Sequence, residues 1–283
     1  MDEKLGHKKN SGKSTVSRKI IPITELRYFY KSLSELRLST ITQLQIVEDI
    51  TRKENFTKLI SWYNESKKHF AEKYENSEES FLPDDLSHRR SLSINDKAIS
   101  STQDVISVFN EKQKEDGLIH VKVEDDHNYD FCYIEREVSP YRTTNSEFVT
   151  GKSGKSSGTG GVDFIGWNPT KKLPILGEIK VGGDQNPFYA LIQLLTYLSE
   201  LSTPNQIKRI NKYKLFGNIP DLTHETSFYL YILLVNKDPF KIKKGILSKT
   251  QKLAADLKKP AIPEIEKIVF LNMNSKTKEI LKI

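Results

Sequence analysis

Hydrophobic and polar positions alternate with a helical period in the N-terminal third of the chain. Apolar residues recur every three or four positions in TELRYFYKSLSELRL, ITQLQIVEDITRK and NFTKLISWYNESKKHFAEKY, which begin at positions 24, 41 and 55. This spacing places the apolar side chains on one face of a helix and so predicts three helices. Thr24, which Glu25 follows, is the expected N-cap of the first one.

The middle of the chain changes to a strand pattern. A helix is predicted over residues 97–116 and ends at Gly117. β-Branched and aromatic residues then concentrate in LIHVKVED, YDFCYIEREV, GVDFIGW and LPILGEIKV, which begin at positions 118, 129, 161 and 173. Asn186 and Pro187 are suited to begin another helix, and SFYLYILLVN at 227–236 predicts a last strand. This order predicts an α/β fold with a mixed central sheet.

Two polar segments divide the chain. Residues 1–19 are rich in lysine, glycine and serine without an apolar period, which predicts a disordered basic tail. Residues 75–93 mix acidic residues, serine, proline and a basic pair, which is typical of a linker. We therefore divide the chain into the tail, a helical region with its linker at 20–96, and an α/β domain at 97–283.

The composition indicates a polyanionic partner. The net charge is +7 and the isoelectric point is near 9.1. Many lysines lie within residues 236–260, where Asp238 and Asp256 are the only acidic residues, so this segment could follow a phosphate backbone. Nucleic acid is the partner that this balance favours.

The composition also bears on location and redox chemistry. The chain has neither an apolar run of membrane-spanning length nor the apolar stretch of a secretory signal, which predicts a cytoplasmic protein without a membrane partner. Its single cysteine, Cys132, forms no internal disulfide. Because Cys132 lies in a strand pattern, we expect a small buried residue rather than a reactive thiol.

The chemistry of the chain centres on a predicted hairpin. The polar sequence NPTKK at 168–172 separates two strands and is compatible with a tight turn. If the turn is centred between residues 170 and 171, Asp163 lies opposite Glu178, with Cβ atoms roughly 5 Å apart. Lys180 lies two positions beyond Glu178 and so shares its face of the strand.

Two carboxylates at that distance repel each other unless a positive charge lies between them. Mg²⁺, or Mn²⁺ in its place, would satisfy Asp163 and Glu178, because Mg²⁺ binds few carboxylates together with water and phosphate. Lys180 would polarise a water molecule or stabilise charge on a phosphoryl group. The alternative is that Glu178 and Lys180 form an ion pair on an exposed strand face.

The combination of Asp163, a turn, Glu178-Ile179-Lys180 and a following helix resembles the PD-(D/E)xK nuclease superfamily. Gln193-Leu194-Leu195-Thr196-Tyr197 on that helix resembles the Q-x-x-x-Y pattern of its RecB-like branch. Gln193 and Tyr197 share a helix face, although the polar side of an amphipathic helix would show the same spacing. The resemblance covers residues 98–236.

The resemblance implies a restriction-endonuclease-like core in which Asp163 and Glu178 bind the metal. It also implies that Lys180 positions or activates the attacking water, and that Gln193 and Tyr197 lie near the substrate strand. Val162 stands where many members of the family have a proline.

A third acidic ligand, present in many members of the family, is not assigned. Glu111 and Glu115 are expected to face solvent, because they lie opposite the apolar stripe of their helix. Glu135 and Glu137 share a strand face and are the alternatives.

The glycine-rich segment at 151–161, GKSGKSSGTGG, superficially resembles a phosphate-binding P-loop. Val149 stands where that motif requires its first glycine, and the segment leads into a strand rather than a helix. Because it directly precedes Asp163, we expect a substrate loop in which Lys152 and Lys155 meet phosphates. A surface loop without a role is the alternative.

These features together predict a metal-dependent nuclease of DNA, rather than RNA, in repair, recombination or defence against foreign DNA. The alternatives are a sequence-specific restriction endonuclease and an inactive nucleic-acid-binding module with a nuclease-like fold. The N-terminal helices could read DNA, dock a partner protein, form a homo-oligomer or elaborate the core.

Overall fold

The computed structural model describes residues 24–35, 40–73, 98–123, 128–138, 161–182, 186–212, 219–236 and 244–283. The predicted tail and the whole predicted linker at 75–93 lie outside these ranges, and so does most of the glycine-rich segment, including Lys152 and Lys155.

The described residues form one six-stranded mixed sheet with the strand order β1-β2-β3-β4-β5-β6. The first three strands pair antiparallel, β3, β4 and β5 pair parallel, and β6 returns antiparallel. The strands are β1 Cys132–Val138, β2 Val162–Asn168, β3 Leu173–Val181, β4 Phe228–Asn236, β5 Ile265–Asn274 and β6 Ile280–Lys282.

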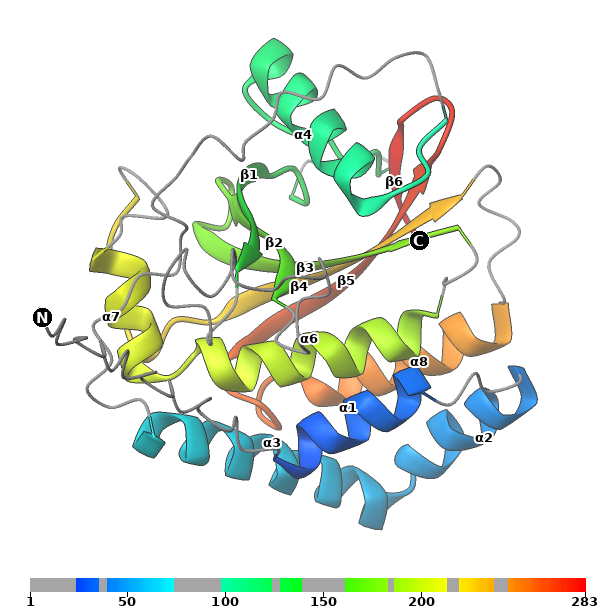
Figure 1. The fold of residues 1–283 in the computed structure, drawn as a ribbon, viewed down its shortest axis with the longest axis vertical. Helices are drawn as coiled ribbons and strands as arrows, with labels where there is room; N and C mark the ends of the chain where they lie inside the picture. The colour runs from blue at the N-terminus through cyan, green and yellow to red at the C-terminus, as the bar shows by residue number, and fades with distance from the viewer. Residues whose placement is uncertain are drawn as a thin grey trace, which may run out of the picture.

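Helices cover both faces of this sheet (Figure 1). On one face lies α4, and on the other lie α6 and α8, with α1, α2 and α3 packed against these two as a further layer. The helices are α1 Glu25–Glu35, α2 Thr40–Ile50, α3 Lys53–Lys73, α4 Thr102–Asp116, α6 Pro187–Leu201, α7 Pro204–Lys212 and α8 Lys244–Leu257. The predicted α/β class with a mixed central sheet is therefore confirmed.

The core has two apolar clusters, one on each side of the sheet. Phe109 of α4 packs against Phe131 and Phe164 of the sheet side, with ring centroids 5.3 to 5.7 Å apart. The other cluster joins α6 and α8 to side chains of α1, α2 and α3. Every residue of β4 is buried, because this strand has parallel neighbours on both sides and helices on both faces.

Local signals explain where several elements begin and end, although α4 begins at Thr102 rather than at the predicted residue 97. Ser101 and Asp104 form a capping box at the start of α4, and Gly117 ends that helix with a left-handed φ of 75°. Asn186 caps α6 and accepts hydrogen bonds from the amides of Phe188 and Tyr189. These caps satisfy helix-end groups that would otherwise lack partners.

Other expectations were wrong. The segment LIHVKVED forms two isolated bridges, at Ile119 and Lys122, in place of a strand. One reason is that the Val121 amide donates to the Asp130 carboxylate at 2.8 Å, so a side chain takes the place of a neighbouring strand. β4 is not the last strand, because β5 and β6 follow it. Cys132 is partly exposed rather than buried, and partial burial raises the pKa of its thiol.

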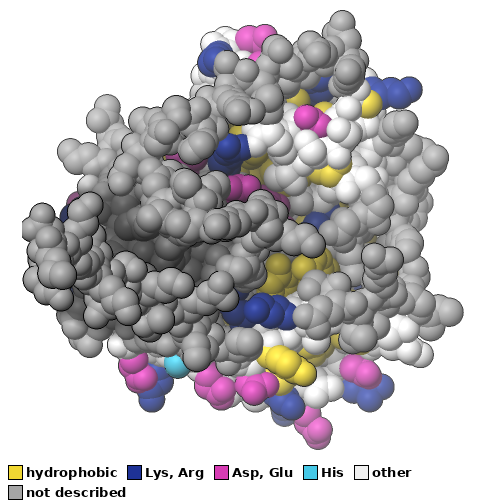
Figure 2. Space-filling model, viewed as in Figure 1, with side chains coloured by type: hydrophobic (Ala, Val, Ile, Leu, Met, Phe, Trp, Pro, Cys, Tyr) yellow, Lys and Arg dark blue, Asp and Glu magenta, His cyan; other side chains and the backbone are white. Residues whose placement is uncertain are grey.

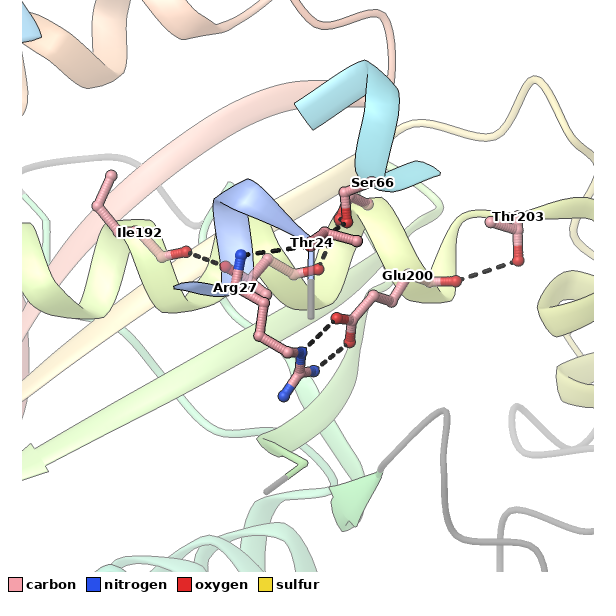
Figure 3. Close-up of polar contacts among 8 residues, drawn as sticks. Thr24, Arg27, Ser66, Ile192, Glu200 and Thr203 are labelled. Atoms are coloured by element: carbon pink, nitrogen blue, oxygen red, sulfur yellow. Dashed lines mark hydrogen bonds and ion pairs between the residues drawn. The ribbon is translucent and has the colours of Figure 1, made fainter. Parts of the chain in front are cut away.

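A buried ion pair joins the N-terminal helix α1 to α6 (Figure 3). The Arg27 guanidinium donates to both carboxylate oxygens of Glu200, at 2.8 and 2.5 Å, and the two side chains are 2% and 0% exposed. Thr24, at the start of α1, donates to Ser66 of α3, and Ser199 of α6 donates to the same hydroxyl at 2.8 Å. Polar contacts therefore hold three helices together inside the protein.

The described surface carries mixed charge along one edge. Figure 2 shows acidic and basic side chains interspersed along the lower edge of the face that it presents, where Figure 1 places α2 and α3. Within the basic segment 236–260, Lys249 pairs with Glu48 and Lys259 pairs with Glu266. In the described part of the chain, no helix has both the length and the apolarity needed to cross a bilayer.

Replacing Arg27 with alanine is expected to lower the free energy of unfolding by about 3–5 kcal/mol, because Glu200 keeps its buried charge but loses both guanidinium hydrogen bonds. Urea denaturation would measure the change. Arg52→Ala is the matched control, since the Arg52–Asp49 pair is 74% and 53% exposed and should contribute less than about 1 kcal/mol. Equal losses in the two variants would contradict the structural role of the buried pair.

Gly177→Ala is expected to destabilise the protein by about 1–3 kcal/mol, because a Cβ atom at this position would overlap the buried ring of Phe164. Gly245→Ala in α8 is the control: its Cβ would lie 3.6 Å from Leu44, an ordinary contact, so unchanged or greater stability is expected. Thermal unfolding of both variants tests this, and Gly177→Ala with wild-type stability would refute it.

Candidate active site

The hairpin of β2 and β3 has the predicted register. Phe164 pairs with Gly177 and Ile165 with Leu176, so Asp163 and Glu178 are the next opposed positions. The Asp163 carboxylate accepts a hydrogen bond from the Ile179 amide at 2.8 Å, which holds it against β3. The structure therefore brings the two acidic residues together.

Lys180 lies inside the protein beside Glu178. Its ammonium group is 3.0 Å from Glu178 Oε1 and 2.9 Å from Gln193 Oε1. Glu178 is 2% exposed and Lys180 is 6% exposed. The alternative of an ion pair on an exposed strand face is therefore wrong.

The polar residues of α6 face the protein interior rather than solvent. Gln193 is 7% exposed and Tyr197 is 1% exposed, because α1 and α3 cover the side of α6 that the sheet does not. Tyr189, one turn before Gln193, places its ring centroid 4.4 Å from the Lys180 ammonium. Glu200, two turns after Gln193, binds Arg27. Gln193, Tyr197 and Glu200 thus form a buried polar face, and the interpretation as the solvent-exposed side of an amphipathic helix is also wrong.

The electrostatics of the site favour an added positive charge. Burial, and then the nearby Asp163 carboxylate, raise the pKa of Glu178 well above its usual value, although the Lys180 ammonium opposes the shift. Removal from water also raises the pKa of Asp163, against the effect of the Ile179 amide and Lys180. Burial and the charge of Glu178 raise the pKa of the Tyr197 hydroxyl. A cation would relieve this repulsion.

The acidic pair fits a divalent cation. Glu178 Oε2 is buried and has no hydrogen-bond partner among the described residues. A buried carboxylate oxygen without a partner is costly, and a metal ion would satisfy it. Asp163 and Glu178 would hold the ion, and in the described ranges no group of three or more histidine, cysteine, aspartate or glutamate side chains suits a metal. Mg²⁺ is commonly bound by one or two carboxylates, water and phosphate.

The four other acidic residues considered as metal ligands differ in how exposed they are to solvent. Glu115 is exposed and Glu111 is partly exposed. Glu135 is 8% exposed on β1. Glu137, also on β1, has a left-handed φ of 51°, and its charge raises the pKa of Asp163. A third acidic ligand stays unassigned.

One contribution to the site was missed from the sequence. The Tyr30 ring of α1 stacks on Tyr189, with centroids 5.3 Å apart and an interplanar angle of 21°. The aromatic sequence RYFY predicted a helix, but helical periodicity does not indicate which distant element a helix covers. The predicted phosphate contacts of Lys152 and Lys155 lie outside the described residues.

No protein-family model, no curated protein and no solved structure matches this chain. The geometry of the site is therefore the basis for a functional assignment.

Asp163→Asn is expected to raise the melting temperature of the metal-free protein by about 2–4 °C, because the change removes the charge that repels buried Glu178. Asparagine keeps an acceptor for the Ile179 amide. Mg²⁺ should stabilise the wild type and have little effect on the variant. Calorimetry with and without Mg²⁺ measures both quantities.

Asp256→Asn, an exposed aspartate in α8, is the control and should leave both melting temperature and Mg²⁺ response unchanged. An Asp163→Asn protein that melts earlier and responds to Mg²⁺ like the wild type would contradict the metal-binding pair.

Proposed function

We propose that this protein is a metal-dependent nuclease with a restriction-endonuclease-like core that hydrolyses phosphodiester bonds in DNA. The observation that carries the proposal is the convergence of Asp163, Glu178 and Lys180 in one buried site, with a Glu178 oxygen that lacks a hydrogen-bond partner among the described residues. Such a set binds a divalent cation and a phosphate group together.

The topology around the site supports the resemblance to the PD-(D/E)xK superfamily. The carboxylates lie on the antiparallel β2–β3 hairpin, α6 follows, and β4 returns parallel to β3. The Q-x-x-x-Y residues Gln193 and Tyr197 lie on that following helix, and Gln193 contacts Lys180 directly. This arrangement of sheet, helix and site residues is the structural support for the proposed core.

The acidic pair and Lys180 would have different parts in phosphodiester hydrolysis. A cation held by Asp163 and Glu178 would supply Lewis-acid stabilisation and lower the pKa of a bound water. Lys180 is held by Glu178 and Gln193, so its ammonium group is preorganised to orient a water molecule or to stabilise charge on phosphoryl oxygens. Because Lys180 is buried, its charge acts through a medium of low dielectric constant.

The choice of DNA rests on the resemblance and on the net charge of +7. A basic protein attracts a phosphate backbone, and the attraction weakens as salt rises. Repair, recombination and defence against foreign DNA are the settings in which such an enzyme would act.

Purified protein is expected to cleave DNA with Mg²⁺ or Mn²⁺ and to lose activity with a chelator. Supercoiled plasmid and end-labelled single-stranded and double-stranded linear DNA would distinguish internal from terminal cleavage. Lys180→Ala should lower kcat by about 10²–10³-fold, because the positioned ammonium group is lost. Asp163→Asn should abolish the metal response.

Lys171→Ala is the matched control, because this exposed lysine lies in the turn of the same hairpin and should be dispensable. Cleavage that persists with chelator, or that Lys180→Ala leaves intact, would overturn the proposal. Salt-sensitive DNA binding without cleavage would instead identify an inactive binding module. Discrete fragments from a long duplex would indicate a restriction endonuclease.

A further inference from the structure

Three side chains form a continuous stack between the candidate site and the N-terminal helix. The Lys180 ammonium lies 4.4 Å from the centroid of the Tyr189 ring. Tyr30 stacks on Tyr189 at a centroid distance of 5.3 Å, and its ring also lies 6.4 Å from that of Tyr197. The lysine contact is attractive because an aromatic face is negative, and aromatic rings attract each other when they stack with an offset or are tilted.

Helix α1 is firmly placed relative to this stack. Arg27, one turn before Tyr30, binds Glu200 through two buried hydrogen bonds, and its guanidinium carbon lies 5.7 Å from the Tyr197 ring centroid. The buried ion pair therefore fixes the distance between α1 and α6. Tyr30 is held where it can support Tyr189.

The Tyr30 hydroxyl is neutral beside the acidic pair. Burial raises the pKa of Tyr30 far above its ordinary value, and the neighbouring Tyr197 and Tyr189 and then Glu178 act in the same direction. A neutral ring is compatible with a structural contact beside the acidic pair, and a phenolate there would add to its repulsion.

Resting on the proposed nuclease function, we propose that Tyr30 is a positioning residue of the active site, which holds Tyr189 in place and through it the ammonium group of Lys180. Helix α1 then completes the site rather than forming a separate module. The inference concerns a part of the chain that lies before residues 98–236 and so outside the resemblance to the nuclease superfamily.

The first test measures the accessibility of Lys180 and needs no nuclease activity. Amine labelling followed by mass spectrometry would compare wild type, Tyr30→Ala, Tyr30→Phe and Tyr28→Ala. Tyr30→Ala should label Lys180 roughly tenfold faster, because the aromatic support is lost. Tyr30→Phe keeps the ring and should restore the slow rate. Tyr28, which is 63% exposed on the same helix, is the control and should not change it.

An internal reference separates local loosening from general unfolding. Lys67 of α3 is 26% exposed and pairs with Glu264 on the same side of the molecule, so its labelling reports wider opening of the N-terminal helices. A rise confined to Lys180 supports the positioning role. An equal rise at both lysines, or no rise at Lys180, overturns it.

The second test measures catalysis. Tyr30→Ala should lower kcat roughly tenfold with little change in KM, because Lys180 acts in the transition state more than in substrate binding. Tyr189→Ala should have a similar effect, and the double variant should be no worse than either, since both act through one contact. Fully additive losses would overturn the inference. If the wild type cleaves nothing while labelling of Lys180 responds as expected, the nuclease function fails and the support of Lys180 by Tyr30 stands.

Discussion

Glu178 and Lys180 are charged residues held almost completely out of water between β3 and α6, and the surrounding structure is arranged to satisfy them. Burial of a charge is costly unless hydrogen bonds and opposite charges compensate for it. Lys180 is compensated by Glu178, Gln193 and the Tyr189 ring, whereas Glu178 keeps one oxygen without a partner among the described residues. This imbalance is the reason why we propose that a cation binds at the site.

The same problem recurs two turns further along α6. Glu200 is fully buried, and it is satisfied by Arg27 from α1, about a hundred and seventy residues away in the chain. One face of this helix thus carries both Gln193, which contacts Lys180 of β3, and Glu200, which binds Arg27 of α1. The acidic site and the packing of α1 are joined through this single helix, which links stability of the N-terminal layer to the geometry of the site.

Local sequence information was sufficient for much of the fold. The caps at Ser101 and Asn186 and the apolar, β-branched runs of β2 and β3 depend on residues within a few positions of each other. In the turn, the Lys171 amide donates a hydrogen bond to the Asn168 side chain at 2.8 Å. The strand register that follows from this turn brings Asp163 beside Glu178. By contrast, LIHVKVED has strand-forming residues but forms only isolated bridges, because pairing depends on what lies next to it in space.

Residue types and spacing therefore determined the hairpin, its acidic pair and the helix that carries Gln193 and Tyr197. Tertiary structure alone decided which faces of that helix are buried, that Tyr197 and Glu200 point inward, and that Tyr30 reaches the site. The physical reason is range: caps, turns and strand register arise from contacts between near neighbours. The partner of a helix face, such as Arg27 for Glu200, depends on the packing of the whole chain.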